Sequence, residues 1–156
     1  MASTIRYLII IVLFTGMARG QAAKDSDERR NAILDYQLTM PRANQLITAL
    51  EEMTKYVVSS PDYVERVRKS MQMTPLEQMA QIDKDPKASD ILKKNQLTSK
   101  DYILGVPVLR MALLVASGMP QGPNVIASPA NVAFAKANLS VLKPKMDAAD
   151  GAAARR

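Results

Sequence analysis

The sequence predicts an all-α protein: a single compact domain of five to six helices around a central apolar, proline-kinked helix at residues 98–118. Three observations predict this class. Residues that cap helix N-termini stand directly before proline at several places. Apolar residues recur at helical spacing after these caps, and no segment except residues 36–38 alternates apolar and polar residues as a half-buried strand does.

Six positions have the features of a helix start. A capping side chain accepts a hydrogen bond from a free N–H of the first turn, and a proline at the first helical position loses no bond there. Thr74 and Thr98 each have an acidic residue three positions later, Glu77 and Asp101, which is typical of a capping box. The helices expected from the six starts cover residues 39–58, 61–72, 75–84, 86–95, 98–118 and 129–142.

The segment from Tyr102 to Met119 is apolar on nearly all sides. As a helix it would be about 27 Å long, close to the thickness of a bilayer core. Arg110 at its middle would cost roughly 2.5–3.5 kcal/mol on membrane insertion, and Pro107 predicts a bend. The other expected helices have one-sided apolar stripes that need a partner. We therefore interpret the segment as the central core helix and expect no transmembrane span in the mature chain.

The N-terminus has the features of a cleaved secretory signal peptide. Arg6 supplies a positive charge, Tyr7 to Phe14 is a short apolar run, and small residues follow. This pattern predicts cleavage near residue 20, so that residues 1–20 are removed, and an uncleaved anchor is the alternative. We expect residues 21–34 to be a flexible segment, 35–142 the helical domain and 143–156 a disordered tail. The protein is then periplasmic in a bacterium, or secreted.

Two residue types are missing, and their absence limits the chemistry. The chain has no cysteine, which excludes thiol catalysis, iron–sulfur clusters and cysteine-ligated zinc, and no histidine, the usual general base near neutral pH. The 21 basic and 15 acidic residues are interspersed, which does not indicate nucleic-acid binding. We expect no catalytic residue, no cofactor and no metal.

Short motifs do not indicate an active site. Ser140 to Lys143 matches S-x-x-K by letter alone, because the companion motifs of penicillin-recognising enzymes are absent. Asp83 to Asp85 resembles the start of a calcium loop, but the glycine and the final glutamate of that loop are missing. Asn131, three residues after Ser128, is expected to bond locally at the helix start.

Three residues of the central helix, Arg110, Met111 and Leu114, are the candidate contacts to a ligand or partner. Arg110 has two interpretations. It either reaches water or pairs with an acid, or it is the polar anchor of an apolar ligand pocket. The methionines of neighbouring helices could line an adaptable groove. The acids considered for pairing with Arg110 are Asp101, Glu77 and Asp83.

Two stretches carry a resemblance to other proteins. With "LTSKDY" at residues 97–102 and "SPANVAFAKAN" at residues 128–138, the chain resembles a loose group of small exported all-helical bacterial proteins of unknown function. The likeness covers roughly residues 74–142. It implies a helical, exported protein, and it brings no catalytic residue with it.

These observations predict a non-enzymatic binding or interaction protein of the bacterial cell envelope, with an unknown envelope protein as partner. One alternative is a carrier of a small apolar or lipid-like ligand, held between the central helix and its methionine-bearing neighbours. Another is a hydrolase that uses carboxylates alone. That enzyme would need two acids to converge in a pocket, and no such pair is visible in the sequence.

Overall fold

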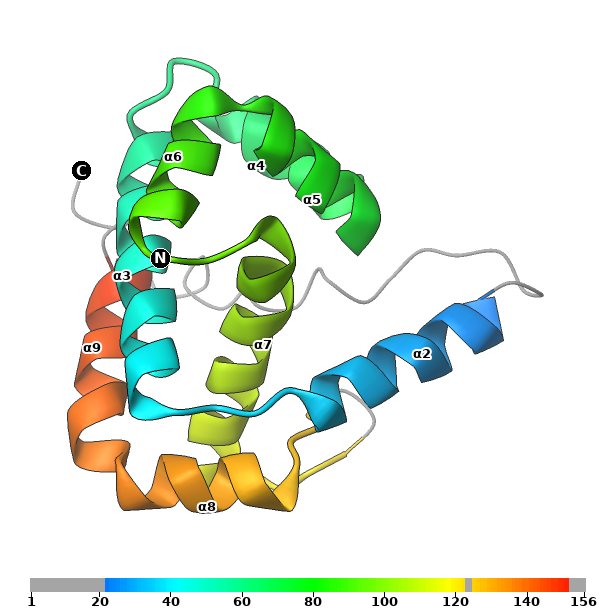
Figure 1. The fold of residues 1–156 in the computed structure, drawn as a ribbon, viewed down its shortest axis with the longest axis vertical. Helices are drawn as coiled ribbons and strands as arrows, with labels where there is room; N and C mark the ends of the chain where they lie inside the picture. The colour runs from blue at the N-terminus through cyan, green and yellow to red at the C-terminus, as the bar shows by residue number, and fades with distance from the viewer. Residues whose placement is uncertain (1–21, 123–124, 152–156) are drawn as a thin grey trace, which may run out of the picture.

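A computed structural model gives the fold, and the structure describes residues 22–122 and 125–151. Within these ranges the protein is all-helical, with eight helices and no strand (Figure 1). The count exceeds the five to six helices expected. The signal peptide predicted at residues 1–20 lies outside the described residues. The helices are α2 (Ala22–Asp35), α3 (Met40–Val58), α4 (Tyr63–Gln72), α5 (Pro75–Lys84), α6 (Pro86–Lys94), α7 (Ser99–Ala116), α8 (Pro129–Ala137) and α9 (Leu139–Gly151).

The predicted capping boxes at the starts of α5 and α7 are present. The hydroxyls of Thr74 and Thr98 accept the N–H groups of Glu77 and Asp101, at 3.3 and 3.0 Å. In return, the two carboxylates accept the N–H groups of the threonines. Each box satisfies donors that a helix start leaves free, so these two helices begin where the sequence places them.

Helix α4 begins two residues later than predicted. Ser60 does not cap it, because its hydroxyl donates backwards to the carbonyl of Tyr56 at the end of α3. Asp62 occupies the cap position without a side-chain cap hydrogen bond. A Ser-Pro pair therefore marks the end of one helix here as well as the approach to the next.

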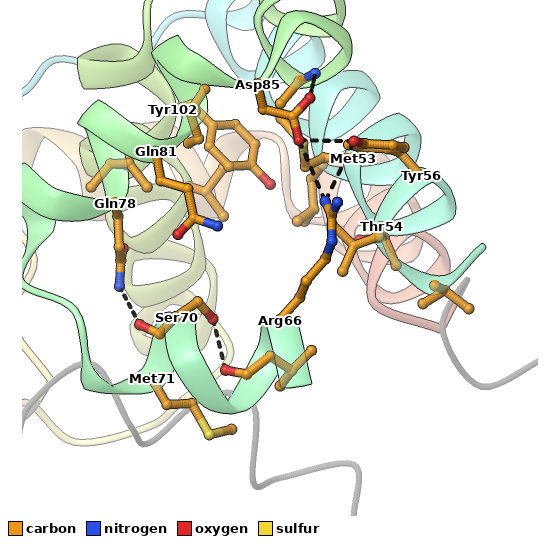
Figure 2. Close-up of a pocket in the computed structure, with 18 of the residues that line it drawn as sticks. Met53, Thr54, Tyr56, Arg66, Ser70, Met71, Gln78, Gln81, Asp85 and Tyr102 are labelled. Atoms are coloured by element: carbon orange, nitrogen blue, oxygen red, sulfur yellow. Dashed lines mark hydrogen bonds and ion pairs between the residues drawn. The ribbon is translucent and has the colours of Figure 1, made fainter. Parts of the chain in front are cut away.

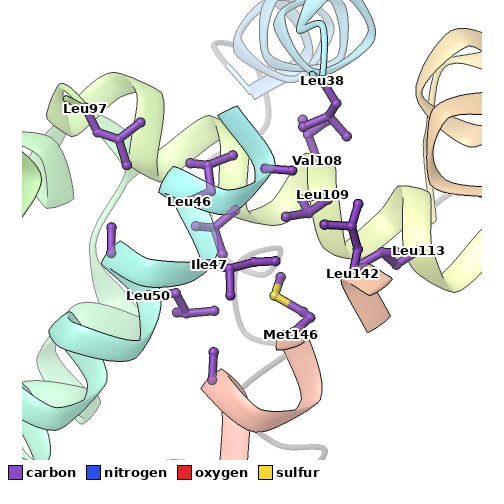
Figure 3. Packing of buried hydrophobic residues seen from close by; sticks show 14 of the residues in the cluster. Leu38, Leu46, Ile47, Leu50, Leu97, Val108, Leu109, Leu113, Leu142 and Met146 are labelled. Carbon is purple, nitrogen blue, oxygen red and sulfur yellow. The ribbon is translucent and has the colours of Figure 1, made fainter. Parts of the chain in front are cut away.

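Helix α7 is the centre of the packing, as the sequence predicted. It packs against α2, α3, α5, α6, α8 and α9. Its buried side chains meet those of α3 and α9 in the core that Figure 3 shows, where Leu46, Leu109 and Leu142 have no exposed surface. In the described part of the chain, no helix has both the length and the apolar character needed to cross a membrane. Pro107 lies within α7, and a bend there stays a prediction.

Gly105 allows α7 to approach its neighbours closely. A Cβ atom at this position would lie 2.6 Å from the hydroxyl oxygen of Tyr36 and 2.8 Å from two methyl carbons of Leu46. Real Cβ atoms almost never approach other atoms so closely. The missing side chain is therefore what brings α3 and the segment before it against the middle of α7.

The last predicted helix, residues 129–142, is two helices in the structure. Helix α8 ends at Ala137, and the side-chain amide of Asn138 donates to the carbonyl of Phe134 at 2.8 Å. The chain then changes direction, and α9 runs alongside α3 (Figure 1). An Asn at a helix end satisfies carbonyls that a continuing helix would have bonded, and no helix end was predicted from the sequence at Asn138.

The ends of the described chain differ from the expected domain boundaries. The disordered tail was expected from residue 143, but α9 continues to Gly151. Leu142, Met146 and Ala149 are buried at spacings of four and three, which gives α9 a stripe that packs on α3. At the other end, residues 22–35 form α2, and Ile33 anchors it against α7. The flexibility expected for residues 21–34 stays a prediction.

Asn131 joins two distant parts of the chain. Its side-chain oxygen accepts the N–H of Leu38 at 3.0 Å, and its side-chain nitrogen donates to the carbonyl of Tyr36 at 2.6 Å. The expected local bond at the helix start is present, from the backbone N–H of Asn131 to the Ser128 hydroxyl, but the side chain of Asn131 bonds distant residues. With 2% of its surface exposed, Asn131 is a buried polar group whose bonds fix residues 36–38 against α8.

Candidate functional site

A cavity of about 360 Å³ lies between α3, α4, α5 and α7, with residues of α6 and α9 at its edge (Figure 2). Ligand sites in proteins typically measure about 300–1,000 Å³, and they combine apolar walls with a few polar groups. The cavity is partly open to solvent, so it is a surface pocket and not a closed void in the core. The main apolar lining residues are Leu50, Met53, Val57, Val67, Ile82 and Val106.

The apolar stripe of α4 faces this cavity. Tyr63, Val67 and Met71 recur at every fourth residue, and all three line it. Neither α4 nor α5 has a fully buried residue, and Val64, one turn before Val67, is 74% exposed and does not line the cavity. The sequence predicted that these short helices must dock on something. They dock over a cavity and therefore form one side of it.

One ion pair at the cavity joins α4 to the α5–α6 junction. The Tyr56 hydroxyl donates to Asp85 at 2.8 Å, and Arg66 donates to the same carboxylate at 3.4 Å and to Asp62 at 3.0 Å. Burial raises the pKa of Asp85. However, hydrogen bonds from Tyr56, from the first amides of α6 and from Arg66 outweigh burial and hold that pKa below its ordinary value. Asp85 is therefore a fixed anion.

A second ion pair joins α7 to α9. Arg110 lines the cavity and donates through one terminal nitrogen to Asp150, which lines it as well. The Arg110 side chain is 17% exposed, and its Nε has no hydrogen-bond partner among the described residues. Arg110 therefore combines the two interpretations made from the sequence, because it borders a pocket and pairs with an acid.

The acid that pairs with Arg110 is none of the three considered from the sequence. Asp101, the first of them, lies 3.8 Å from Arg42. Asp150 was missed because residues 143–156 were expected to be a disordered tail. The apolar spacing of Leu142, Met146 and Ala149 was the signal that could have extended the last helix to it.

The other two candidate contacts lie outside the cavity. Its lining on α7 runs from Tyr102 to Arg110, and Met111 and Leu114 are half-buried further along the helix. A ligand cavity beside these two residues was expected to favour the carrier, and the cavity lies about one turn earlier.

Two uncharged polar side chains project into the cavity. Figure 2 shows the hydroxyl of Tyr102, from α7, and the amide of Gln81, from α5, directed toward its interior. No hydrogen bond joins either side chain to another group in the part of the chain that the structure describes. Burial raises the pKa of Tyr102 to about 12, so its hydroxyl is protonated at physiological pH.

The described residues contain no cluster of three or more acidic side chains that could hold a metal ion. A comparison of the chain with protein-family models, curated proteins and solved structures gives no significant match. The resemblance carried by residues 97–102 and 128–138 therefore stays a prediction. The cavity is the feature from which a function can be argued.

Proposed function

We propose that the protein is a non-enzymatic carrier of the bacterial cell envelope, which holds a small apolar or lipid-like ligand in the cavity between α3, α4, α5 and α7. The cavity carries this proposal. An engineered cavity of about 150 Å³ lined by apolar side chains stays dry and binds benzene. A cavity of about 360 Å³ with mostly apolar walls has room for a larger apolar body.

The sequence supports a place in the envelope and a role without chemistry. Residues 1–20 have the features of a secretory signal. The absence of cysteine and histidine removes the side chains that most often act as nucleophile and base near neutral pH. A carrier needs neither of them.

An interaction protein is less well supported than a carrier. Large apolar side chains that are exposed in the described chain come from four different elements, and single exposed residues of this kind need no explanation. A partner surface would require them to be contiguous. These residues are Val64 on α4, Leu76 on α5, Met119 in the loop after α7 and Val141 on α9.

A carboxylate hydrolase is also less well supported. Asp85 and Asp150 both line the cavity, but each accepts a hydrogen bond from its own arginine. Acid catalysis by a carboxyl needs a pKa raised toward the working pH, whereas the pKa of Asp85 is lowered. Asp85 is therefore a poor proton donor, and both ion pairs join helices to one another.

Two tryptophan substitutions on α4 test the carrier. Val67 lines the cavity, while Val64, three residues earlier on the same helix, is 74% exposed and does not. We expect native mass spectrometry of wild-type protein from its own host to show a bound small molecule. Val64→Trp should retain that molecule and Val67→Trp should lose it, because the indole fills the space.

Circular dichroism and thermal unfolding establish that both variants fold. If Val67→Trp does not, Ile82→Phe fills the cavity from α5 instead. A bare wild-type monomer, or equal ligand retention by the two tryptophan variants, would refute the carrier. Periplasmic fractionation with N-terminal sequencing of the exported protein tests the predicted signal cleavage near residue 20.

A further inference from the structure

The charges that line the cavity are already balanced. Arg66 and Arg110 supply two positive charges, and Asp85 and Asp150 supply two negative charges. Each arginine donates to one of these carboxylates. A charged ligand group would therefore add a net charge to a partly buried space. That is unfavourable unless an existing pair opens to accept it or, for an anion, the unpartnered Nε–H of Arg110 donates to it.

The uncharged polar groups of the cavity are not paired with one another as the charged groups are. The Tyr102 hydroxyl and the Gln81 amide point into the space, and the described chain offers them no hydrogen-bond partner. Thr54 and Tyr63 add two further hydroxyl groups to the lining. Both groups border the open space of the cavity, so whatever fills that space, water or a ligand, is placed to hydrogen-bond them.

Building on the carrier function proposed above, we infer that the natural ligand is an uncharged amphiphile. Its polar head is an alcohol, ester or amide that hydrogen-bonds the Tyr102 hydroxyl and the Gln81 amide, and its alkyl body lies against the apolar walls. A neutral head satisfies the free donors and acceptors and leaves both ion pairs closed. Because Tyr102 stays protonated at physiological pH, it can donate to a carbonyl or hydroxyl oxygen of the ligand.

The volume limits the length of the alkyl body. Scaling from benzene, with six carbons in about 150 Å³, a cavity of about 360 Å³ holds roughly 14 non-hydrogen atoms. An unbranched chain of ten carbons with a small head group therefore fits. 1-Decanol, decanoate and decylammonium share one chain and differ in the charge of the head, so they are matched probes.

Isothermal titration calorimetry of the purified protein with these three probes at neutral pH tests the inference. We expect 1-decanol to bind at least tenfold more tightly than either ion. Tyr102→Phe should weaken 1-decanol binding about three- to tenfold, the usual effect of one lost hydrogen bond. Tyr36→Phe is the matched control, because the Tyr36 hydroxyl is buried outside the cavity. It should leave the affinity unchanged.

Tighter binding of decanoate would overturn the inference and show that Arg66 or Arg110 binds the ligand carboxylate. Tighter binding of decylammonium would also overturn the inference, because the preferred head group would then be a cation. If Tyr102→Phe and wild type bind 1-decanol with equal affinity, the Tyr102 hydroxyl does not hydrogen-bond the ligand. Binding of none of the three probes would instead refute the carrier function itself.

Discussion

Replacing Asn131 should lower the free energy of unfolding by an amount that follows from its two side-chain hydrogen bonds. Asn131→Ala removes the acceptor of the Leu38 N–H and the donor to the Tyr36 carbonyl. Leaving a buried backbone group without a partner costs about 1–3 kcal/mol. For the two groups together we expect the free energy of unfolding to fall by about 2–6 kcal/mol. In a chain of this size that corresponds to a melting temperature roughly 5–20 °C lower.

Asn138→Ala is the matched control. Asn138 donates to the carbonyl of Phe134 within one turn and is only partly buried, so its loss should cost less than about 1 kcal/mol. Urea unfolding followed by circular dichroism at 222 nm measures both variants against wild type. If Asn131→Ala and Asn138→Ala lie within about 1 kcal/mol of each other, water replaces the Asn131 bonds and the attachment of residues 36–38 to α8 contributes little.

Two further changes test the packing and the charges. Gly105→Ala should lower the free energy of unfolding by about 1–2 kcal/mol, because its Cβ would press on Leu46, while Gly151→Ala, with open space around it, should not. Asp85→Asn should cost about 1 kcal/mol at pH 7 in urea unfolding. Asp85 has a lower pKa in the folded state, so it stabilises the protein above its unfolded pKa and loses that effect as the pH falls through the folded value. The variant and wild type should converge as the pH falls below the folded pKa of Asp85, and a constant gap would contradict this.

The helix starts could be predicted because caps act locally. A threonine hydroxyl and an acid three residues later lie within one turn, so the sequence alone contains both partners. Thr74 with Glu77 and Thr98 with Asp101 form in the structure as the spacing requires. The identity of α7 as the central helix was predictable for a similar reason, since its apolar character exceeds that of every other expected helix.

The features that were missed depend on contacts between distant residues. Asn131 bonds residues 93 and 95 positions away, and Asp150 lies 40 positions after Arg110. No spacing rule relates such pairs. The cavity is a further case. The stripe of α4 shows which face is apolar, but a stripe against a packed core and a stripe against a cavity have the same sequence pattern.

The two helices without a fully buried residue, α4 and α5, also form one side of the cavity. Helices α4 and α5 have ten residues each, too few for stability alone, and neither has a fully buried residue. Polar attachments of these helices include the Arg66–Asp85 pair and the bonds from Gln78 to the carbonyls of Ser70 and Met73. The free energy of local unfolding is smallest in regions where the fewest side chains are buried. We therefore expect a ligand to enter through this side and to stabilise it once bound, because binding favours the closed state.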